Sequence, residues 1–236
     1  MNEPKNTKPL SYWPNEYVSV SALQSFESCP VSFFLHYFCG VEWKANKNMK
    51  LGTIFQNALN AKYKGEDYTE IIKTIEGPDG KIAQDLIKLA NKFEGIVSID
   101  TPYVVDFGLG IDVKFVPDLL IKNEKYTCIE NKYSGGYYNE DMVHKQMQGR
   151  VYSYGLHKVF GEEPEVRYQI FNKKNKTVKL IDVKYDNTDI AEMISWILST
   201  LGRVRRCFES DNWVIHQHSK YPCNLGNEAC PIISIL

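Results

Sequence analysis

The sequence has no long uncharged run, no dense cysteine pattern and no excess of charge of either sign. The longest uncharged stretch near the start, VSVSALQSF, is short and polar, so it fits neither a signal peptide nor a membrane span. We therefore expect a cytoplasmic protein without a membrane partner. A net charge of -1 over 236 residues gives no global attraction to nucleic acid, so phosphate binding would need local patches or metal ions.

The six cysteines are too widely scattered for a small secreted disulfide scaffold. They occupy positions 29, 39, 128, 207, 223 and 230. Repeats and low-complexity linkers are absent as well, and 43% hydrophobic with 24% charged residues is ordinary for a soluble globular fold. We expect reduced thiols or a metal site.

The order of the predicted elements indicates an α/β fold. Residues 1–17 are polar and carry three prolines, which predicts a flexible arm, and residues 18–236 are expected to form a single domain. Helical spacing covers 19–38 (as two short helices), 49–63, 67–76, 79–94, 139–160 and 187–209. Strand-like segments are VVDFGLGI, VKFVPDLLI and YTCIENKY, which suggest an antiparallel run, then EVRYQIFN and TVKLIDVKY. We expect a mixed central sheet flanked by helices, with an N-terminal helical elaboration.

Three charged residues on two adjacent predicted strands suggest a metal-dependent phosphodiesterase. Glu130 and Lys132 share one face of a strand, and Asp118 lies on the strand before it. Two carboxylates suit Mg²⁺, and an ammonium beside the attacking water can stabilise the charge that develops on the phosphate. The alternative is a turn residue and a solvated strand face. The apolar VPDLLI and TCI neighbours favour a buried site, where unpaired charge is costly.

The chain resembles the RecB-like branch of the PD-(D/E)XK nuclease superfamily in four ordered motifs. Val116-Pro117-Asp118 corresponds to the PD and Glu130-Asn131-Lys132 to the ExK. Gln148 and Tyr152 match a helical Q-x-x-x-Y, and the run from Ser19 to Pro30 matches an S-x-S-x-L-x-x-(F/Y)-x-x-C-P opening. The resemblance implies a restriction-endonuclease-like fold, metal binding by Asp118 and Glu130, water activation by Lys132, and support of the site by Gln148 and Tyr152.

One position departs from the family pattern. The G-x-x-x-H helix of the family supplies a histidine ligand, but this chain has Gln56 after Gly52. A neutral amide oxygen can ligate Mg²⁺ or Mn²⁺ weakly or through water, and it can equally be a polar helix position with no ligand role.

Some relatives, namely the CRISPR-adaptation and AddB-type exonucleases, imply a four-iron four-sulfur cluster. Cys29, Cys223 and Cys230 occupy corresponding positions, but the usual C-x-x-C start is missing. Cys207, or a histidine such as His216 or His218, would have to be the fourth ligand, and clusters normally take four thiolates. The alternative is a set of reduced packing thiols.

Residues beside the ExK strand are candidates for DNA contact. Tyr137 and Tyr138 flank the loop after this strand and could stack on unpaired bases, although such tyrosines more often pack or anchor a loop. Arg150, within the Q-x-x-x-Y motif, is a further candidate.

The sequence thus predicts a Mg²⁺- or Mn²⁺-dependent deoxyribonuclease. The resemblance implies an exonuclease on single-stranded or end-exposed DNA in recombination, repair or replication, with a helicase or recombinase as a partner to consider. The main alternative is a DNA-binding scaffold that keeps the fold but is catalytically weak or inactive. A restriction endonuclease is less favoured because no separate recognition domain is apparent.

Overall fold

The computed structural model describes Leu10, residues 12–42 and residues 45–213. They fall into two compact units. One unit contains the described residues up to 42, Tyr103–Phe115 and the chain from Asn187 onward, and the other contains Ala45–Pro102 and Val116–Asp186. In the part of the chain that is described, no helix is long and apolar enough to cross a membrane.

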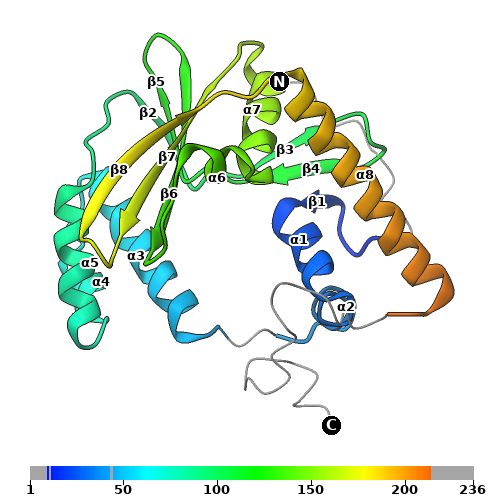
Figure 1. Ribbon diagram of the computed structural model, residues 1–236, viewed down its shortest axis with the longest axis horizontal. Helices are drawn as coiled ribbons and strands as arrows, with labels where there is room; N and C mark the ends of the chain where they lie inside the picture. The colour runs from blue at the N-terminus through cyan, green and yellow to red at the C-terminus, as the bar shows by residue number, and fades with distance from the viewer. Residues whose placement is uncertain (1–9, 11, 43–44, 214–236) are drawn as a thin grey trace. The chain divides into compact units, whose positions relative to one another are not determined.

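The unit that contains Ala45–Pro102 and Val116–Asp186 is built on a five-stranded sheet in the order β2-β5-β6-β7-β8 (Figure 1). The parallel pair β6 and β7 sits among antiparallel neighbours, so the sheet is mixed, as the sequence predicts. Its strands are β2 (Ile96–Ile99), β5 (Leu119–Lys122), β6 (Tyr126–Ser134), β7 (Glu165–Asn172) and β8 (Thr177–Val183).

Helices pack on both faces of this sheet, because successive residues of a strand point to opposite sides. On β7, Phe171 joins a buried cluster with Phe55 and Leu86 from the helices on one face. Tyr168 joins a second buried cluster with Val143 on the other face. The helices are α3 (Lys47–Lys64), α4 (Thr69–Lys73), α5 (Pro78–Leu89), α6 (Glu140–His144) and α7 (Met147–Phe160).

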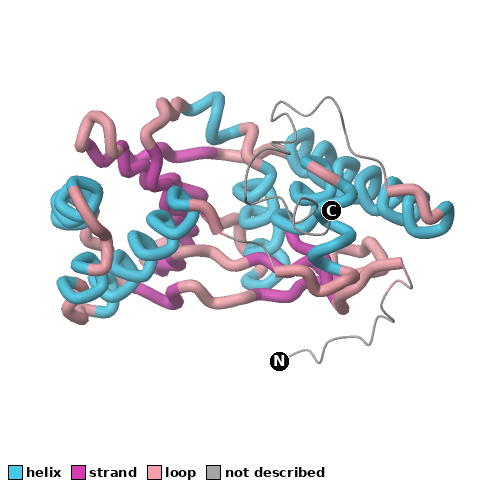
Figure 2. Tube along the Cα trace, turned by 90° about the horizontal axis from the view of Figure 1, so that it is seen from below, coloured by secondary structure: helices cyan, strands magenta, loops and turns pink. Residues whose placement is uncertain are grey.

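The described residues of the other unit combine a three-stranded sheet, in the order β1-β4-β3, with three helices. Its core is rich in aromatic rings, and Phe26 meets Phe33 edge to face with centroids 5.5 Å apart. Trp13, in the segment predicted to be an arm, is buried here. Figure 1 labels the elements of this unit, and Figure 2 colours the helices and strands of the chain by type. The elements are β1 (Tyr17–Ser19), β3 (Tyr103–Asp106), β4 (Asp112–Phe115), α1 (Val20–Ser28), α2 (Pro30–Tyr37) and α8 (Asn187–Ser210).

The predicted antiparallel run of three strands is wrong. The segment VKFVPDLLI is not one strand: β4 ends at Phe115, β5 begins at Leu119, and the two belong to different sheets. Pro117 explains the break, because proline donates no backbone hydrogen bond and restricts the conformation of Val116 before it. Asp118 therefore lies at the start of a strand rather than in the middle of one.

Two further element boundaries differ from the sequence predictions. The helix predicted over 139–160 is two helices, α6 and α7, with Lys145 and Gln146 between them. Strands β1 and β2 were not predicted. Both are short, and on β2 the residues Ile96 and Val97 are exposed, so the sequence there lacks the alternation of a half-buried strand.

Candidate active site

Asp118 and Glu130 meet at the end of the β5–β6 pairing. The antiparallel register sets Leu119 opposite Ile129 as the last pair at this end of the β5–β6 ladder. Asp118 and Glu130 are the next residue on each strand beyond that pair, so their side chains are neighbours. The backbone N–H of Asn131 donates to Oδ2 of Asp118 at 2.6 Å and holds that carboxylate against β6. Because β5 reaches only to Leu119 while β6 continues to Ser134, the carboxylates lie at an open edge of the sheet.

Four side chains next to this edge form a closed ring of hydrogen bonds. Nζ of Lys132 donates to Oε1 of Glu130 at 2.6 Å and to Oε1 of Gln148 at 3.1 Å. Nε2 of Gln148 donates to the hydroxyl of Tyr152 at 2.5 Å. That hydroxyl shares its one proton between Oε2 of Glu130 at 3.0 Å and the carbonyl oxygen of Val116 at 2.9 Å. The ring fixes both oxygens of Glu130 and the ammonium of Lys132.

The predicted helix spacing accounts for this ring. Gln148 and Tyr152 are one turn apart on α7, so their side chains leave the helix on the same face. Glu130 and Lys132 alternate with Asn131 along β6 and share the other wall. Glu130 is 3% exposed, which is a burial that a carboxylate tolerates only with partners such as these.

Burial also sets the charge state of the site. It raises the pKa of Asp118 well above its usual range, and the negative charge of Glu130 raises it further, against the opposing bond from Asn131. Burial lowers the pKa of Lys132, but the attraction of Glu130 and Asp118 outweighs this and the net shift is upward. When both carboxyl groups are ionised, two negative charges face one ammonium, which leaves one negative charge for a cation to offset.

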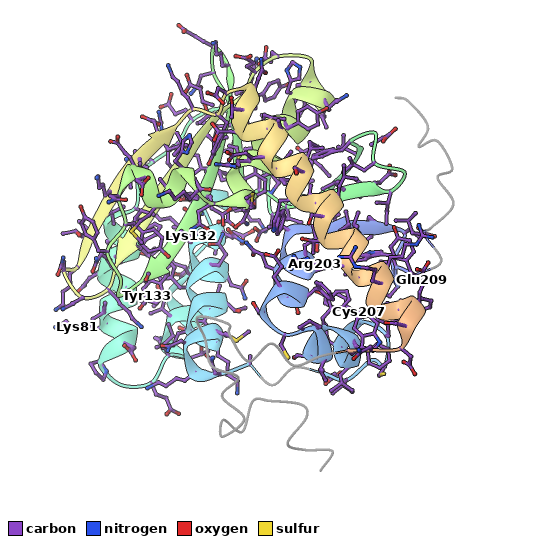
Figure 3. The ribbon with its side chains drawn as sticks, turned by 45° about the vertical axis from the view of Figure 1, so that its right-hand side comes forward. Lys81, Lys132, Tyr133, Arg203, Cys207 and Glu209 are labelled. Atoms are coloured by element: carbon purple, nitrogen blue, oxygen red, sulfur yellow. The ribbon has the colours of Figure 1, made fainter. Side chains whose placement is uncertain are left out.

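The site opens into a pocket of about 470 Å³ between β6 and α3. That volume is within the range of small-ligand sites. Figure 3 labels Lys132 and Tyr133, two of the β6 residues that line it. The whole lining consists of Met49, Gly52, Thr53, Phe55, Gln56, Asn57, Asp118, Glu130, Asn131, Lys132 and Tyr133. Gln56, at the position of the departure from the family pattern, therefore lines the same pocket as Asp118 and Glu130.

Two polar residues near the pocket were missed by the sequence analysis. Nε2 of Gln56 donates to Oδ1 of Asn60 at 3.0 Å, and Nδ2 of Asn60 donates to Oδ2 of Asp100. The backbone N–H of Asp100 in turn donates to the carbonyl oxygen of Asp118 at 3.2 Å. The spacing of four residues on one helix could have indicated the contact between Gln56 and Asn60. No pattern in the sequence indicates the contact between Asn60 and Asp100.

The other face of β6 is anchored by buried amides. The side chain of Asn131 accepts from Nε2 of Gln169 at 2.9 Å, and the hydroxyl of Tyr63 lies 3.4 Å from the same oxygen. Nε2 of Gln169 also donates to the Tyr63 hydroxyl at 2.6 Å. Burial raises the pKa of Tyr63, so this hydroxyl stays protonated. These contacts brace the residue whose backbone holds Asp118.

The sequence pattern of the PD-(D/E)XK nuclease superfamily matches residues 17–235, which is nearly the whole chain. The chain belongs to this superfamily. A search of curated proteins finds no match.

A solved structure has the same fold as this chain. A protein of Eubacterium rectale, described by inference as an exonuclease, superposes with a TM-score of 0.64 at 14% identity, covering 98% of this chain and 93% of its own. LHK-Exo in complex with dAMP gives a TM-score of 0.49 at 12% identity, over 84% of this chain and 92% of its own.

Nucleases of this superfamily generally use divalent metal ions, and the donors here suit a hard cation. Asp118 and Glu130 offer carboxylate oxygens, and Gln56 offers an amide oxygen from the same pocket. These are the ligand types that Mg²⁺ and Mn²⁺ prefer. Within the described part of the chain, no three His, Cys, Asp or Glu residues are grouped to hold a metal. The amide and the water molecules of the ion would therefore have to complete its coordination.

Of the cysteines in the cluster hypothesis, Cys29 and Cys207 belong to the unit that does not contain this pocket. Cys29 begins α2, where its sulfur accepts from the backbone N–H of Ser32 at 3.4 Å. Cys207 lies on α8, as Figure 3 shows. Both are free thiols, and Cys223 and Cys230 lie outside the described residues. The cluster stays a prediction.

The candidates for DNA contact differ in exposure. The side chain of Tyr137 is 73% exposed, whereas Tyr138 packs partly against the cluster that contains Val143. Arg150 is 5% exposed on α7, which leaves little of its side chain to meet DNA. Tyr137 therefore has the largest accessible surface of the three.

Proposed function

We propose that this protein is a Mg²⁺- or Mn²⁺-dependent nuclease that hydrolyses phosphodiester bonds of DNA. The observation that carries the proposal is the hydrogen-bonded ring of Lys132, Glu130, Tyr152 and Gln148 beside Asp118, in an open pocket. Superfamily membership supports the same conclusion. Hydrolysis of a phosphodiester needs a positioned water and relief of the negative charge that develops on the phosphate.

Each side chain has a distinct role in this proposal. Asp118 and Glu130 would hold the divalent ion, which supplies Lewis acidity and lowers the pKa of a bound water. Lys132 keeps its proton, so its ammonium stabilises the phosphate as charge accumulates there. Tyr152 and Gln148 position Glu130 and Lys132 through their hydrogen bonds.

The expected substrate is single-stranded or end-exposed DNA, cut as an exonuclease in recombination, repair or replication. The sequence resemblance motivates this choice, and the open sheet edge beside β6 is compatible with a strand that enters from its end. A helicase or recombinase that delivers such ends would be the corresponding partner.

The test compares three labelled substrates with Mg²⁺, Mn²⁺ or a chelator. Single strands labelled at the 5′ end, single strands labelled at the 3′ end and circular single strands separate an exonuclease from an endonuclease. We expect cleavage of the linear strands only, no cleavage with the chelator, and a loss of at least about 100-fold in rate in Glu130→Gln and Lys132→Ala. Glu124→Gln, which removes an exposed carboxylate in the turn after β5, is the matched control. Unchanged cleavage in Lys132→Ala would refute the proposed chemistry.

Gln56 favours a second function, that of a DNA-binding scaffold with weak or no chemistry. The amide replaces the histidine of the family pattern, and a weaker ligand would lower the occupancy of the metal. Calorimetry distinguishes the two functions. Metal and DNA binding without cleavage by the wild-type chain would select the scaffold.

A further inference from the structure

A chain of hydrogen bonds connects the pocket to Asp100. Gln56 donates to Asn60, and Asn60 donates to Asp100. Asn60 is 8% exposed on α3, so its amide depends on these two neighbours for hydrogen bonds. Asp100 follows β2, and its own backbone N–H is bonded to the carbonyl of Asp118. The chain therefore joins α3 to the segment that carries the first carboxylate of the site.

The chemistry of Asp100 sets the direction of every bond in this chain. An ionised carboxylate only accepts hydrogen bonds, so Asn60 must present its NH₂ group to Asp100. The carbonyl of Asn60 is then left for Gln56, which must present its own NH₂ group in turn. An amide that is held by its nitrogen has only its oxygen free to serve as a ligand.

We propose that Asp100 and Asn60 are positioning residues that keep the amide oxygen of Gln56 directed to the pocket as a metal ligand. With Asp118 and Glu130, Gln56 then completes a donor set made only of oxygen. Such a set lacks the imidazole that favours Ni²⁺, so its preference for Ni²⁺ over Mg²⁺ and Mn²⁺ is smaller than that of a site with a histidine ligand. This inference rests on the proposed function, because it names the source of metal selectivity at the same site.

Two substitutions at Asp100 separate the role of its carboxylate from that of its backbone. Asp100 has a φ of 46°, a left-handed conformation that glycine and asparagine also adopt readily. Asp100→Gly therefore removes the carboxylate without straining the backbone that is bonded to Asp118. Asp100→Asn keeps an acceptor for Asn60 but loses the charge, so it separates the hydrogen-bond effect from the field of the carboxylate.

The experiment measures binding of Mn²⁺ to the full chain by calorimetry, in wild type and in a double-mutant cycle. We expect Asp100→Gly and Gln56→Ala each to weaken binding by roughly 10-fold, and the double variant to bind no more weakly than Gln56→Ala alone. Asp100→Asn should lose less than Asp100→Gly. Glu124→Gln is the control for an exposed carboxylate elsewhere in the same unit and should bind Mn²⁺ as wild type does.

Three outcomes would overturn the inference. Additive losses in the double variant would mean that Asp100 acts independently of Gln56, through its field or as a ligand itself. Equal losses in Asp100→Asn and Asp100→Gly would assign the effect to charge alone. An unchanged ratio of Ni²⁺ to Mg²⁺ affinity in Gln56→His would remove the basis for selectivity, since an imidazole there should raise that ratio. If wild type binds no Mn²⁺ and cleaves no DNA, the proposed function itself fails, which the cleavage assay shows separately.

Discussion

At the scale of single residues, the site is defined by what each carboxylate is bonded to. Glu130 has a partner on each oxygen, Lys132 on one and Tyr152 on the other, whereas Asp118 accepts from the backbone of Asn131 and lies close to a like charge. Both oxygens of Glu130 are therefore fixed by its neighbours. Asp118 carries the unfavourable electrostatic energy of the metal-free site.

That asymmetry predicts a stabilising substitution. The pKa of Asp118 is raised in the folded chain, so the folded state holds its proton more tightly than the unfolded state does. This contribution favours folding below the unfolded pKa of about 4 and is lost as pH rises toward the folded pKa. In chelator, Asp118→Asn should raise the free energy of unfolding at pH 8 by about 1 to 3 kcal/mol, because a buried charge is removed.

Chemical denaturation at several pH values checks this expectation. The gain should shrink as pH falls and be smallest below about 4, where Asp118 of the wild type is protonated in both states. Glu124→Gln serves as the control at the same pH values. A gain in Asp118→Asn that is equal at pH 4 and pH 8 would contradict the electrostatic explanation.

At the scale of elements, the sequence predicts which side chains share a face of one helix or strand, but it does not predict contacts between residues that are distant in the chain. The helix spacing that unites Gln148 and Tyr152 and the strand alternation that unites Glu130 and Lys132 are local, and both predictions place these side chains where the structure has them. The relation of Asn60 to Asp100 depends on residues 40 positions apart in the chain, so no periodicity could reveal it. The break of VKFVPDLLI could have been anticipated from its proline.

The close approach of α7 to β7 yields a prediction for the element that carries Gln148 and Tyr152. A Cβ added at Gly149 would lie 2.2 Å from the hydroxyl of Tyr185 and 2.5 Å from that of Tyr168. Gly149→Ala should therefore push α7 away from the sheet, lower the free energy of unfolding by about 1 to 3 kcal/mol and reduce cleavage.

Gly202→Ala is the matched helix control for this prediction. At Gly202 on α8 the nearest neighbour of an added Cβ is the flexible end of Arg206 at 3.8 Å. Alanine there should stabilise the protein by up to about 1 kcal/mol through its helix propensity. Thermal unfolding and the DNA assay measure both variants, and equal stabilities for the two would rule out close packing at Gly149.

At the scale of the whole molecule, a net charge of -1 conceals a strongly polarised site. The pocket places Asp118 and Glu130 against one ammonium, so the proposed divalent cation would bind the folded chain, whereas the unfolded chain offers no comparable arrangement. Ligands that bind only the folded state stabilise it by mass action. Metal affinity should therefore be visible in stability, independently of catalysis.

Melting temperature gives the corresponding prediction. With a dissociation constant of about 1 mM, 10 mM Mn²⁺ should add about 1.4 kcal/mol to the stability of the unit that holds the pocket. For a chain of this size the expected increase in Tm is about 3 to 6 °C. Glu130→Gln should lose most of this increase, and Glu124→Gln should keep it. An increase of the same size in Glu130→Gln would place the metal elsewhere.

The bond from the backbone of Asn131 to Asp118 limits which substitutions the motif tolerates. Because the donor is an amide N–H of the main chain, nineteen of the twenty amino acids could supply it, and proline alone could not. The bond to Asp118 therefore places no restriction on the side chain at position 131, the central position of Glu130-Asn131-Lys132. Its side chain is bonded to Tyr63 and Gln169, and residue 131 also lines the pocket. A mutational scan of position 131 would thus report on these contacts and on the pocket, with proline as the single substitution that also removes the bond to Asp118.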